Sequence, residues 1–179
     1  DTIAGFDYDD CPGHATWLEP VEWLGADLAK TYPLHLISNQ PASRLHSQLD
    51  NGIIAQEAKV AGREAVTLHP DDAAARNIKD GDVVRLFNDR GECLAGAVIS
   101  DGISPGIVQL PTGAWYDPTR PGQTGSLDKH GNPNILTRDA GTSSLAQGPT
   151  AHSCLVEVEV YEGKPSPITA FRPPRMENR

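Results

Sequence analysis

The sequence has few of the features that mark disulfide-rich domains, membrane proteins and nucleic-acid-binding proteins. Its three cysteines, Cys11, Cys93 and Cys154, are odd in number and far apart, which argues against a disulfide framework or a CxxC site and indicates free thiols. No apolar run approaches the roughly 20 residues of a membrane-spanning helix. The net charge is −9, and no basic face is evident that would neutralise nucleic-acid phosphates. We therefore expect a soluble domain with neither a membrane span nor a nucleic-acid partner.

Self-contained catalytic motifs are also absent. The sequence has no GxSxG elbow, Walker loop, GxGxxG fingerprint or HExxH helix. Cys11 and His14 have the spacing of zinc ligands, but no second pair completes a four-ligand site. A small hydrolytic or self-processing enzyme that uses His130 or Asp128 stays open, because a catalytic triad is a spatial arrangement. A binding domain is the better class.

Short apolar runs between turns dominate the chain. Its 179 residues can bury one substantial core, and 17 glycines and 15 prolines indicate many turns. We predict one short helix from Pro70 through Asn77. Strands are predicted at 32–38, 65–68, 83–87, 92–99, 107–111 and 153–160. Six short strands with an inserted helix are typical of a mainly β protein, either a small barrel or a sandwich.

A polar cluster follows the first predicted strand. Pro41 stops the strand, Ser43 is a candidate helix cap, and Arg44 would lie in the first turn, where free amides and a guanidinium hold an anion. His46, Ser47 and Gln48 extend the cluster. A binding site and the solvated face of a turn are both compatible with this pattern.

A second polar stretch, GSLDKHGNPNILTRDAGTSSLAQG (125–148), has neither helical nor strand periodicity. Such long loops are usually functional or disordered, and this one lacks the charge excess of disorder. Its donors and acceptors suit a ligand with many polar edges, such as a nucleotide base or a pterin. They are His130, Asn132, Asn134, Thr137, Asp139, Thr142, Ser143, Ser144 and Gln147. The alternative is a surface loop held by its own turns.

The two ends differ from the middle. Residues 1–30 form an acidic arm with Trp17 and Trp23, which indicates docking against something larger or capping of the domain's own core. Residues 31–160 hold the predicted barrel. Residues 161–179 are proline-rich and are predicted to form a flexible tail.

Four motifs in order carry a resemblance to a known family. They are LHLISNQPASRLHSQLDNG, HPDDAAARNIKDGDVVRLFNDRGE, GAWYDP and GSLDKHGNPNILTRDAGTSSLAQG. Together they resemble the C-terminal domain of bis-(molybdopterin guanine dinucleotide) oxidoreductases, in the branch of dimethyl sulfoxide, trimethylamine N-oxide and biotin sulfoxide reductases. The resemblance implies a double-psi β-barrel, which agrees with the short strands and lacks free edges.

The resemblance also implies a cofactor, two molybdopterin guanine dinucleotides with molybdenum per complete enzyme, and a set of contacts to it. Arg44 suits a pyrophosphate, amides suit the edges of the heterocycles, and Trp115 and Tyr116 suit their faces. The implied cofactor-binding residues are Ser38, Asn39, Arg44, His46, Ser47, Gln48, Trp115, Tyr116, Asn132, Asn134 and Gln147. No catalytic or metal-ligating residue is implied within this chain.

Enzymes of this family are several times longer than 179 residues, and an earlier domain supplies the metal's protein ligand. The resemblance thus implies a fragment that is inactive alone, whose partners are the remaining domains and an S-oxide or N-oxide substrate. Either the bacterial periplasm or the cytoplasm is compatible with the sequence. The alternative is a freestanding small β-barrel that binds an unrelated ligand.

Overall fold

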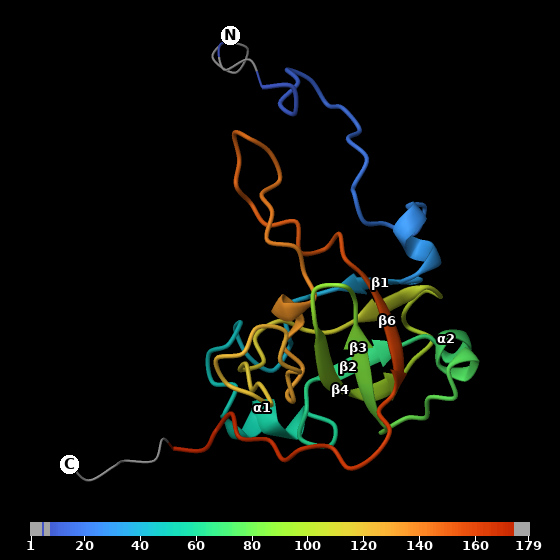
Figure 1. The fold of residues 1–179 in the computed structure, drawn as a ribbon, viewed down its shortest axis with the longest axis vertical. Coiled ribbons are helices and arrows are strands. Elements are labelled where there is room, and N and C mark those ends of the chain that lie inside the picture. The colour runs from blue at the N-terminus through green and yellow to red at the C-terminus, as the bar shows by residue number, and fades with distance from the viewer. Residues whose placement is uncertain (1–4, 6–7, 174–179) are drawn as a thin grey trace, which may run out of the picture.

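Six short strands close into a barrel (Figure 1). The structure, a computed structural model, describes residue 5 and residues 8–173. The strands are β1 (Leu34–Ile37), β2 (Ala65–Leu68), β3 (Val83–Phe87), β4 (Glu92–Ile99), β5 (Ile107–Gln109) and β6 (Leu155–Val160). Their order around the barrel is β1-β5-β2-β4-β3-β6, and β6 pairs antiparallel with β1 to close it. This confirms the predicted mainly β, double-psi barrel class.

Alternating side chains place the core inside this barrel. In β3, Val84 and Leu86 are fully buried whereas Arg85 between them is partly exposed, as expected when successive strand residues point to opposite faces. Strand β4 is buried on both faces from Cys93 to Ala97. The Leu94 amide donates to the Asp128 carbonyl at 2.8 Å, so the segment around Asp128 pairs alongside the start of β4. Val60 lies against Gly96, where an added Cβ would overlap it.

The helices are short and lie outside the barrel. They are α1 (Ile53–Glu57), α2 (Pro70–Ala75) and the 3₁₀ turns η2 (Asp27–Lys30) and η3 (Pro133–Ile135). Helix α2 begins as predicted: Pro70 takes its first turn and the His69 ring accepts the Asp71 amide at 3.1 Å. Within the described residues, no helix combines the length and apolarity needed to cross a membrane.

The helix predicted to begin at Ser43 is wrong. Residues 42–52 form turns and bends, and the next helix begins only at Ile53. His46 and Leu49 have φ angles of 48° and 59°. These values are left-handed and interrupt a right-handed helix, so the backbone here is irregular.

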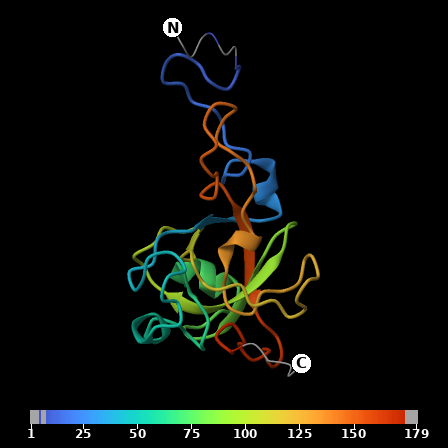
Figure 2. The same ribbon diagram turned by 90° about the vertical axis from the view of Figure 1, so that its left-hand side faces the viewer.

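Residues 8–30 of the acidic arm and the loop around Ser144 project from the same end of the barrel (Figures 1 and 2). The Ser144 amide donates to the Asp10 carboxylate at 2.7 Å, which joins them. Glu22 anchors the arm: it is 2% exposed, pairs with Arg90 at 2.8 Å and accepts the Leu155 amide at 2.8 Å. Trp17, in contrast, is 75% exposed.

Part of the predicted flexible tail lies against the barrel. Arg63 donates to the Ser166 carbonyl at 3.0 Å, and Lys129 donates to the Thr169 hydroxyl at 2.8 Å. Both donors belong to residues 31–160, the predicted barrel region. Residues 174–179 of the tail lie outside the described residues. The boundaries of the arm, barrel and tail stay a prediction.

Candidate functional site

Two parallel strands bring the polar segments together. Strands β1 and β5 pair in parallel, so their carboxyl ends meet at one edge of the barrel. The backbone pairing continues beyond both strands, because Leu110 donates to the Ile37 carbonyl at 3.0 Å and Thr112 donates to the Asn39 carbonyl at 2.9 Å. The segments that follow, 38–50 and 111–117, therefore leave the barrel side by side.

A glycine allows these two segments to approach closely. Gly113 has a φ of 96°, and a Cβ placed on it would overlap the carbonyl group of His46. Only glycine adopts this conformation freely and leaves this space. Gly113 thus fixes the spacing between the turn that carries His46 and the segment that carries Trp115.

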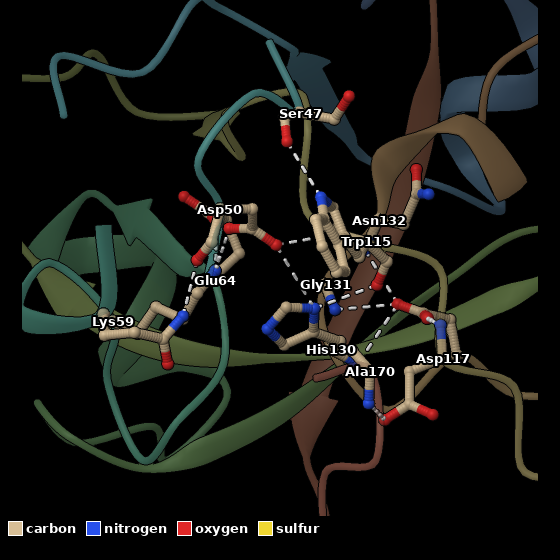
Figure 3. Close-up of polar contacts among 12 residues, drawn as sticks. Ser47, Asp50, Lys59, Glu64, Trp115, Asp117, His130, Gly131, Asn132 and Ala170 are labelled. Carbon is tan, nitrogen blue, oxygen red and sulfur yellow. Dashed lines mark hydrogen bonds and ion pairs between the residues drawn. The ribbon is translucent and has the colours of Figure 1, made fainter. Parts of the chain in front are cut away.

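Asp128 adds a third segment. Its carboxylate accepts the backbone amides of Asp117 at 2.7 Å, His130 at 3.2 Å, Gly131 at 2.7 Å and Asn132 at 2.8 Å. These four donor residues are labelled in the close-up of Figure 3. Asp128 itself is fully buried. One carboxylate therefore folds residues 128–132 and holds them beside residue 117, which places Asn132 next to the other two segments.

Two adjacent hollows form where the three segments meet. The first measures about 430 Å³ and is lined by His46, Ser47, Thr112, Gly113, Ala114, Trp115, Tyr116, Asn132 and Asn134. The second measures about 600 Å³ and is lined by Ser38, His46, Thr112, Asn134, Thr137, Arg138, Asp139, Pro149 and Ala151. They share His46, Thr112 and Asn134, and we call their combined lining the cradle.

The cradle offers polar edges and aromatic surface together. Trp115 is 36% exposed and Tyr116 is 50% exposed. Trp115 is held firmly: its amide donates to Asp50 at 2.9 Å, its indole nitrogen donates to the Ser47 carbonyl at 2.8 Å, and its carbonyl lies 2.9 Å from His130 Nδ1 (Figure 3). A flat ligand with hydrogen-bonding edges matches this combination.

A buried ion network lies beneath the cradle. Arg44 pairs with Glu64 at 2.8 Å and with Asp50 at 3.3 Å, and Lys59 pairs with Asp50 at 2.8 Å and with Glu64 at 2.9 Å. These four side chains are at most 5% exposed. Two cations are therefore matched by two anions, as buried charges require.

Arg44 does not face the cradle, and its predicted role as an anion ligand does not fit this geometry. Its guanidinium donates to Glu64, to the His46 carbonyl at 3.1 Å and to the Thr112 carbonyl at 3.1 Å. A group with these partners and 1% side-chain exposure is not presented to a ligand. Instead it holds together two backbone segments of the cradle.

His130 is a buried neutral group. Burial lowers the pKa of its imidazole, the nearby Lys59 lowers it further, and the contact with the Trp115 carbonyl and the charges of Asp50 and Asp128 only partly offset this. Both His130 and Asp128 are 0% exposed. Neither side chain reaches a substrate at the surface, so this geometry does not support the hydrolytic alternative.

Seven of the implied cofactor-binding residues line the cradle, namely Ser38, His46, Ser47, Trp115, Tyr116, Asn132 and Asn134. Thr137 and Asp139 of the predicted binding loop also line it. Asn39 follows Ser38 and is not part of the cradle lining, and its Oδ1 is buried without a hydrogen-bond partner. Gln48 and Gln147 are exposed outside the cradle lining, and Gln147 donates to the Ser143 carbonyl within its own turn. Sequence reasoning missed Thr112, Gly113 and Arg138. For Gly113, the sequence signal that could have indicated a close backbone approach was a glycine two positions after the predicted strand 107–111.

A larger hollow of about 930 Å³ lies outside strands β4, β3 and β6. Its central charges are already paired, because Arg85 lies 2.8 Å from Glu92 and 2.7 Å from Glu159. We therefore do not assign it as the binding site. The described residues also contain no group of three His, Cys, Asp or Glu side chains able to hold a metal ion.

Comparison with known proteins decides the family. A family model described as "Molydopterin dinucleotide binding domain" matches residues 34–155. The chain belongs to this family. The matched residues contain strands β1 to β5 and all of the cradle, and the match ends at the first residue of β6. They confirm the resemblance carried by the four motifs.

Relatives of this molydopterin dinucleotide binding domain are much longer. Dimethyl sulfoxide/trimethylamine N-oxide reductase of Cereibacter sphaeroides is 51% identical over 168 residues, which are 94% of this chain and 20% of that protein. Trimethylamine-N-oxide reductase 1 of Escherichia coli K12 is 52% identical over 170 residues, again 94% and 20%. The chain thus spans about a fifth of the length of these curated relatives.

A solved structure shares the fold. Acetylene hydratase from Pelobacter acetylenicus superposes with a TM-score of 0.70 at 19% identity, covering 89% of this chain and 22% of that one. At this identity the likeness supports the barrel fold and nothing about the reaction.

Proposed function

We propose that the complete protein is a molybdenum oxidoreductase that reduces S-oxides or N-oxides by oxygen-atom transfer. In it, this chain holds part of two molybdopterin guanine dinucleotides. The observation that carries the proposal is the cradle, which combines amide edges with exposed aromatic rings in a chain of this family. The printed names of the curated relatives support the reaction class. Because catalysis needs the rest of the protein, we expect the isolated chain to be inactive.

The residues present fit such a cofactor. Asn132 and Asn134 supply amides for base and pterin edges, and Trp115 supplies a ring face. Arg138 lines the second hollow with its side chain 34% exposed and only a 3.9 Å approach to Glu22. It is therefore better placed than Arg44 to meet a pyrophosphate. The buried, unpartnered Oδ1 of Asn39 is a further acceptor beside Ser38.

The cofactor and this chain contribute different parts of the function. When bound, the cofactor supplies the oxygen-atom-transfer chemistry. This chain binds and orients it: the amides and Ser38, Ser47 and His46 contact its polar edges, and Trp115 and Tyr116 contact its flat rings. Arg44, Gly113 and Asp128 act indirectly by setting the spacing of the three cradle segments.

We propose that the remaining domains cover two apolar surfaces of this chain. The first is on the arm, residues 1–30, where Trp17, Leu18 and Val21 are 75%, 51% and 66% exposed. The second lies next to the cradle, at Leu45, Leu49, Ile53 and Ile54, with exposures of 58%, 74%, 77% and 70%. Exposed aliphatic patches of this kind usually mark interfaces. Amide hydrogen exchange that stays as fast in the complete protein as in the isolated chain would contradict this docking.

The cradle is tested by one residue inside it and one outside it. In the complete protein, Asn134→Ala removes a side chain shared by both hollows. We expect the affinity for the guanine dinucleotide to fall about fivefold, the equivalent of one lost hydrogen bond, and the guanine bound per protein molecule to fall with it when the cofactor is supplied below saturation. The measurement is the guanine released after denaturation of the purified protein.

Gln147→Ala is the matched control. Both residues are exposed amides of the same loop, but Gln147 lies outside the cradle. We expect its replacement to leave the guanine content unchanged. Equal losses from the two variants, or no loss from Asn134→Ala, would overturn the assignment of the cradle.

A further inference from the structure

The segment after β6 returns to the cradle. Residues 166–171, which we call the strap, are fixed at several points. The Ser166 carbonyl accepts Arg63 at 3.0 Å, and the Thr169 hydroxyl accepts Lys129 at 2.8 Å. Arg63 precedes Ser166 by 103 residues, and Lys129 precedes Thr169 by 40 residues. The strap is therefore held by tertiary contacts and forms no helix or strand of its own.

Asp117 clasps the strap. Its carboxylate accepts the amide and hydroxyl of Thr169 and, at 3.0 Å, the amide of Ala170, and it pairs with Lys129 at 3.0 Å. Burial raises the pKa of this carboxyl, but the hydrogen bonds from Thr169 and then Lys129 outweigh burial, and the net pKa is lowered. Asp117 is therefore charged at neutral pH. Because Asp117 follows Trp115 by only two positions in the sequence, it holds the strap beside Trp115.

The clasp delivers Phe171 to the back of the cradle. The Phe171 ring centroid lies 5.3 Å from that of Trp115, with the rings tilted by 56°. It also lies 5.0 Å from the His130 ring in an edge-to-face arrangement of 83°. These distances and angles are typical of favourable aromatic pairs. Phe171 thus packs against both the wall of the cradle and the histidine that contacts the Trp115 carbonyl.

We propose that the strap sets the position of Trp115 for the cofactor and that Phe171 is the positioning residue. This inference rests on the proposed function, because Trp115 is assigned there to a flat ring of the cofactor. The backbone of Trp115 is held by Asp50 and His130, and its indole nitrogen is held by Ser47. Phe171 adds contact with the indole ring itself. Phe171 thereby resists rotation of the Trp115 indole plane about the hydrogen bond from the indole nitrogen to the Ser47 carbonyl.

Ring orientation matters because stacking is directional. A tryptophan already held at the binding angle loses little conformational freedom when a heterocycle binds, so its affinity is higher than that of a mobile ring. Loss of Phe171 should therefore weaken cofactor binding through Trp115. A strap that merely stabilises the fold would instead make every apolar strap residue equally important.

Ile168 separates these two roles. It belongs to the same strap and faces Gly62, where its Cγ1 lies 3.8 Å from a Cβ placed on that glycine. Ile168→Ala removes apolar contact from the strap without touching an aromatic ring of the cradle. Phe171→Tyr is the conservative variant that retains the ring.

The experiment uses the complete protein labelled with 5-fluorotryptophan. The fluorine signal of Trp115 is identified as the one lost in Trp115→Phe, and release of guanine nucleotide is followed in dilute urea. For Phe171→Ala we expect a displaced, broadened Trp115 signal and release about two- to tenfold faster, the factor that an aromatic pair is worth. Phe171→Tyr should behave as wild type, and Ile168→Ala should change neither readout.

Two outcomes overturn the inference. An unchanged Trp115 signal and release rate in Phe171→Ala would remove the positioning role, as would an equal effect from Ile168→Ala. If Phe171→Ala does not fold, Phe171→Leu replaces it, because leucine retains apolar volume but no ring. Trp115→Ala separates the proposed role of Trp115 from that of Phe171. Fast guanine release in Trp115→Ala together with normal release in Phe171→Ala would refute the positioning role of the strap and leave the proposed function in place. Normal release in Trp115→Ala refutes the Trp115 wall of the proposed function and the strap with it.

Discussion

The long polar loop divides into two halves of similar composition and different structure. In residues 125–136, seven positions are buried, at Ser126, Asp128, Lys129, His130, Gly131, Pro133 and Leu136. In residues 137–150, every position is at least partly exposed. Both halves contain glycine, hydroxyl groups, amides and an aspartate. Composition alone does not separate a structural segment from an exposed one.

Hydrogen-bond partners explain the difference. In the first half, Asp128 binds the amides of its own segment and that of Asp117, and the His130 carbonyl accepts the Glu64 amide at 3.0 Å. In the second half the bonds are largely local, such as Thr142 to the Gly148 carbonyl at 2.8 Å and Gln147 to the Ser143 carbonyl at 2.8 Å. Segments with long-range partners become part of the core, whereas segments with local partners stay at the surface.

The largest contrast should come from the two aspartates. Asp128→Ala leaves four backbone amides of a buried turn without their acceptor, and we expect the free energy of unfolding to fall by about 3 kcal/mol or more. Asp139→Ala, in the exposed half, should change it by less than about 0.5 kcal/mol. Urea unfolding of both variants measures the difference. Similar values would refute the division of the loop.

The two glycines sharpen the same contrast. Gly131 has a φ of 93°, and a Cβ there would lie 2.7 Å from the Glu64 Cβ. Gly131→Ala combines backbone strain with a clash against a buried residue, and we expect it to cost about 2 kcal/mol. Gly141→Ala meets mainly the flexible end of the exposed Gln147 side chain, with the Gln147 Cα farther off at 3.3 Å, and Gly141 has no left-handed φ. Thermal and urea unfolding should show a loss for Gly131→Ala alone, and a comparable loss in Gly141→Ala would contradict this account.

The smallest expected effect is the pH dependence from His130. Its pKa is lowered from 6.5 in the folded state by burial and by Lys59. As pH falls through about 6.5, the unfolded chain binds a proton that the folded chain does not. Stability is therefore full above that pH and decreases below it until the folded pKa is reached, by at most about 1.4 kcal/mol per pH unit.

His130→Gln should remove this part of the pH dependence. The test compares the free energy of unfolding near pH 8 with that near pH 5.5, at either side of the reference value of about 6.5, which cancels any constant loss from the substitution. The exposed His152→Gln is the control and should leave the wild-type difference in place. If His130→Gln kept the wild-type difference in the free energy of unfolding between the two pH values, other groups would be the cause of the pH dependence.

Local patterns predicted most of the barrel. Strands β2, β3 and β4 agree with the predicted 65–68, 83–87 and 92–99, because alternation and turn residues act over a few neighbouring positions. The helix after His69 was predicted for the same reason. The helix at Ser43 was not, because the left-handed residues His46 and Leu49 belong to a turn shaped by contacts with Gly113 and Thr112.

The sequence by itself determined the family and the strand pattern, and it identified nine residues of the cradle. Tertiary structure decided which of the remaining polar groups face a ligand. Arg44 pairs with Glu64, 20 residues away, and Asp117 clasps Thr169, 52 residues away. Such pairs form only when the barrel has closed, because no local pattern records which buried charge or free amide will be brought within hydrogen-bonding distance. The same long-range closure buries one half of the loop and converts part of a proline-rich tail into a strap.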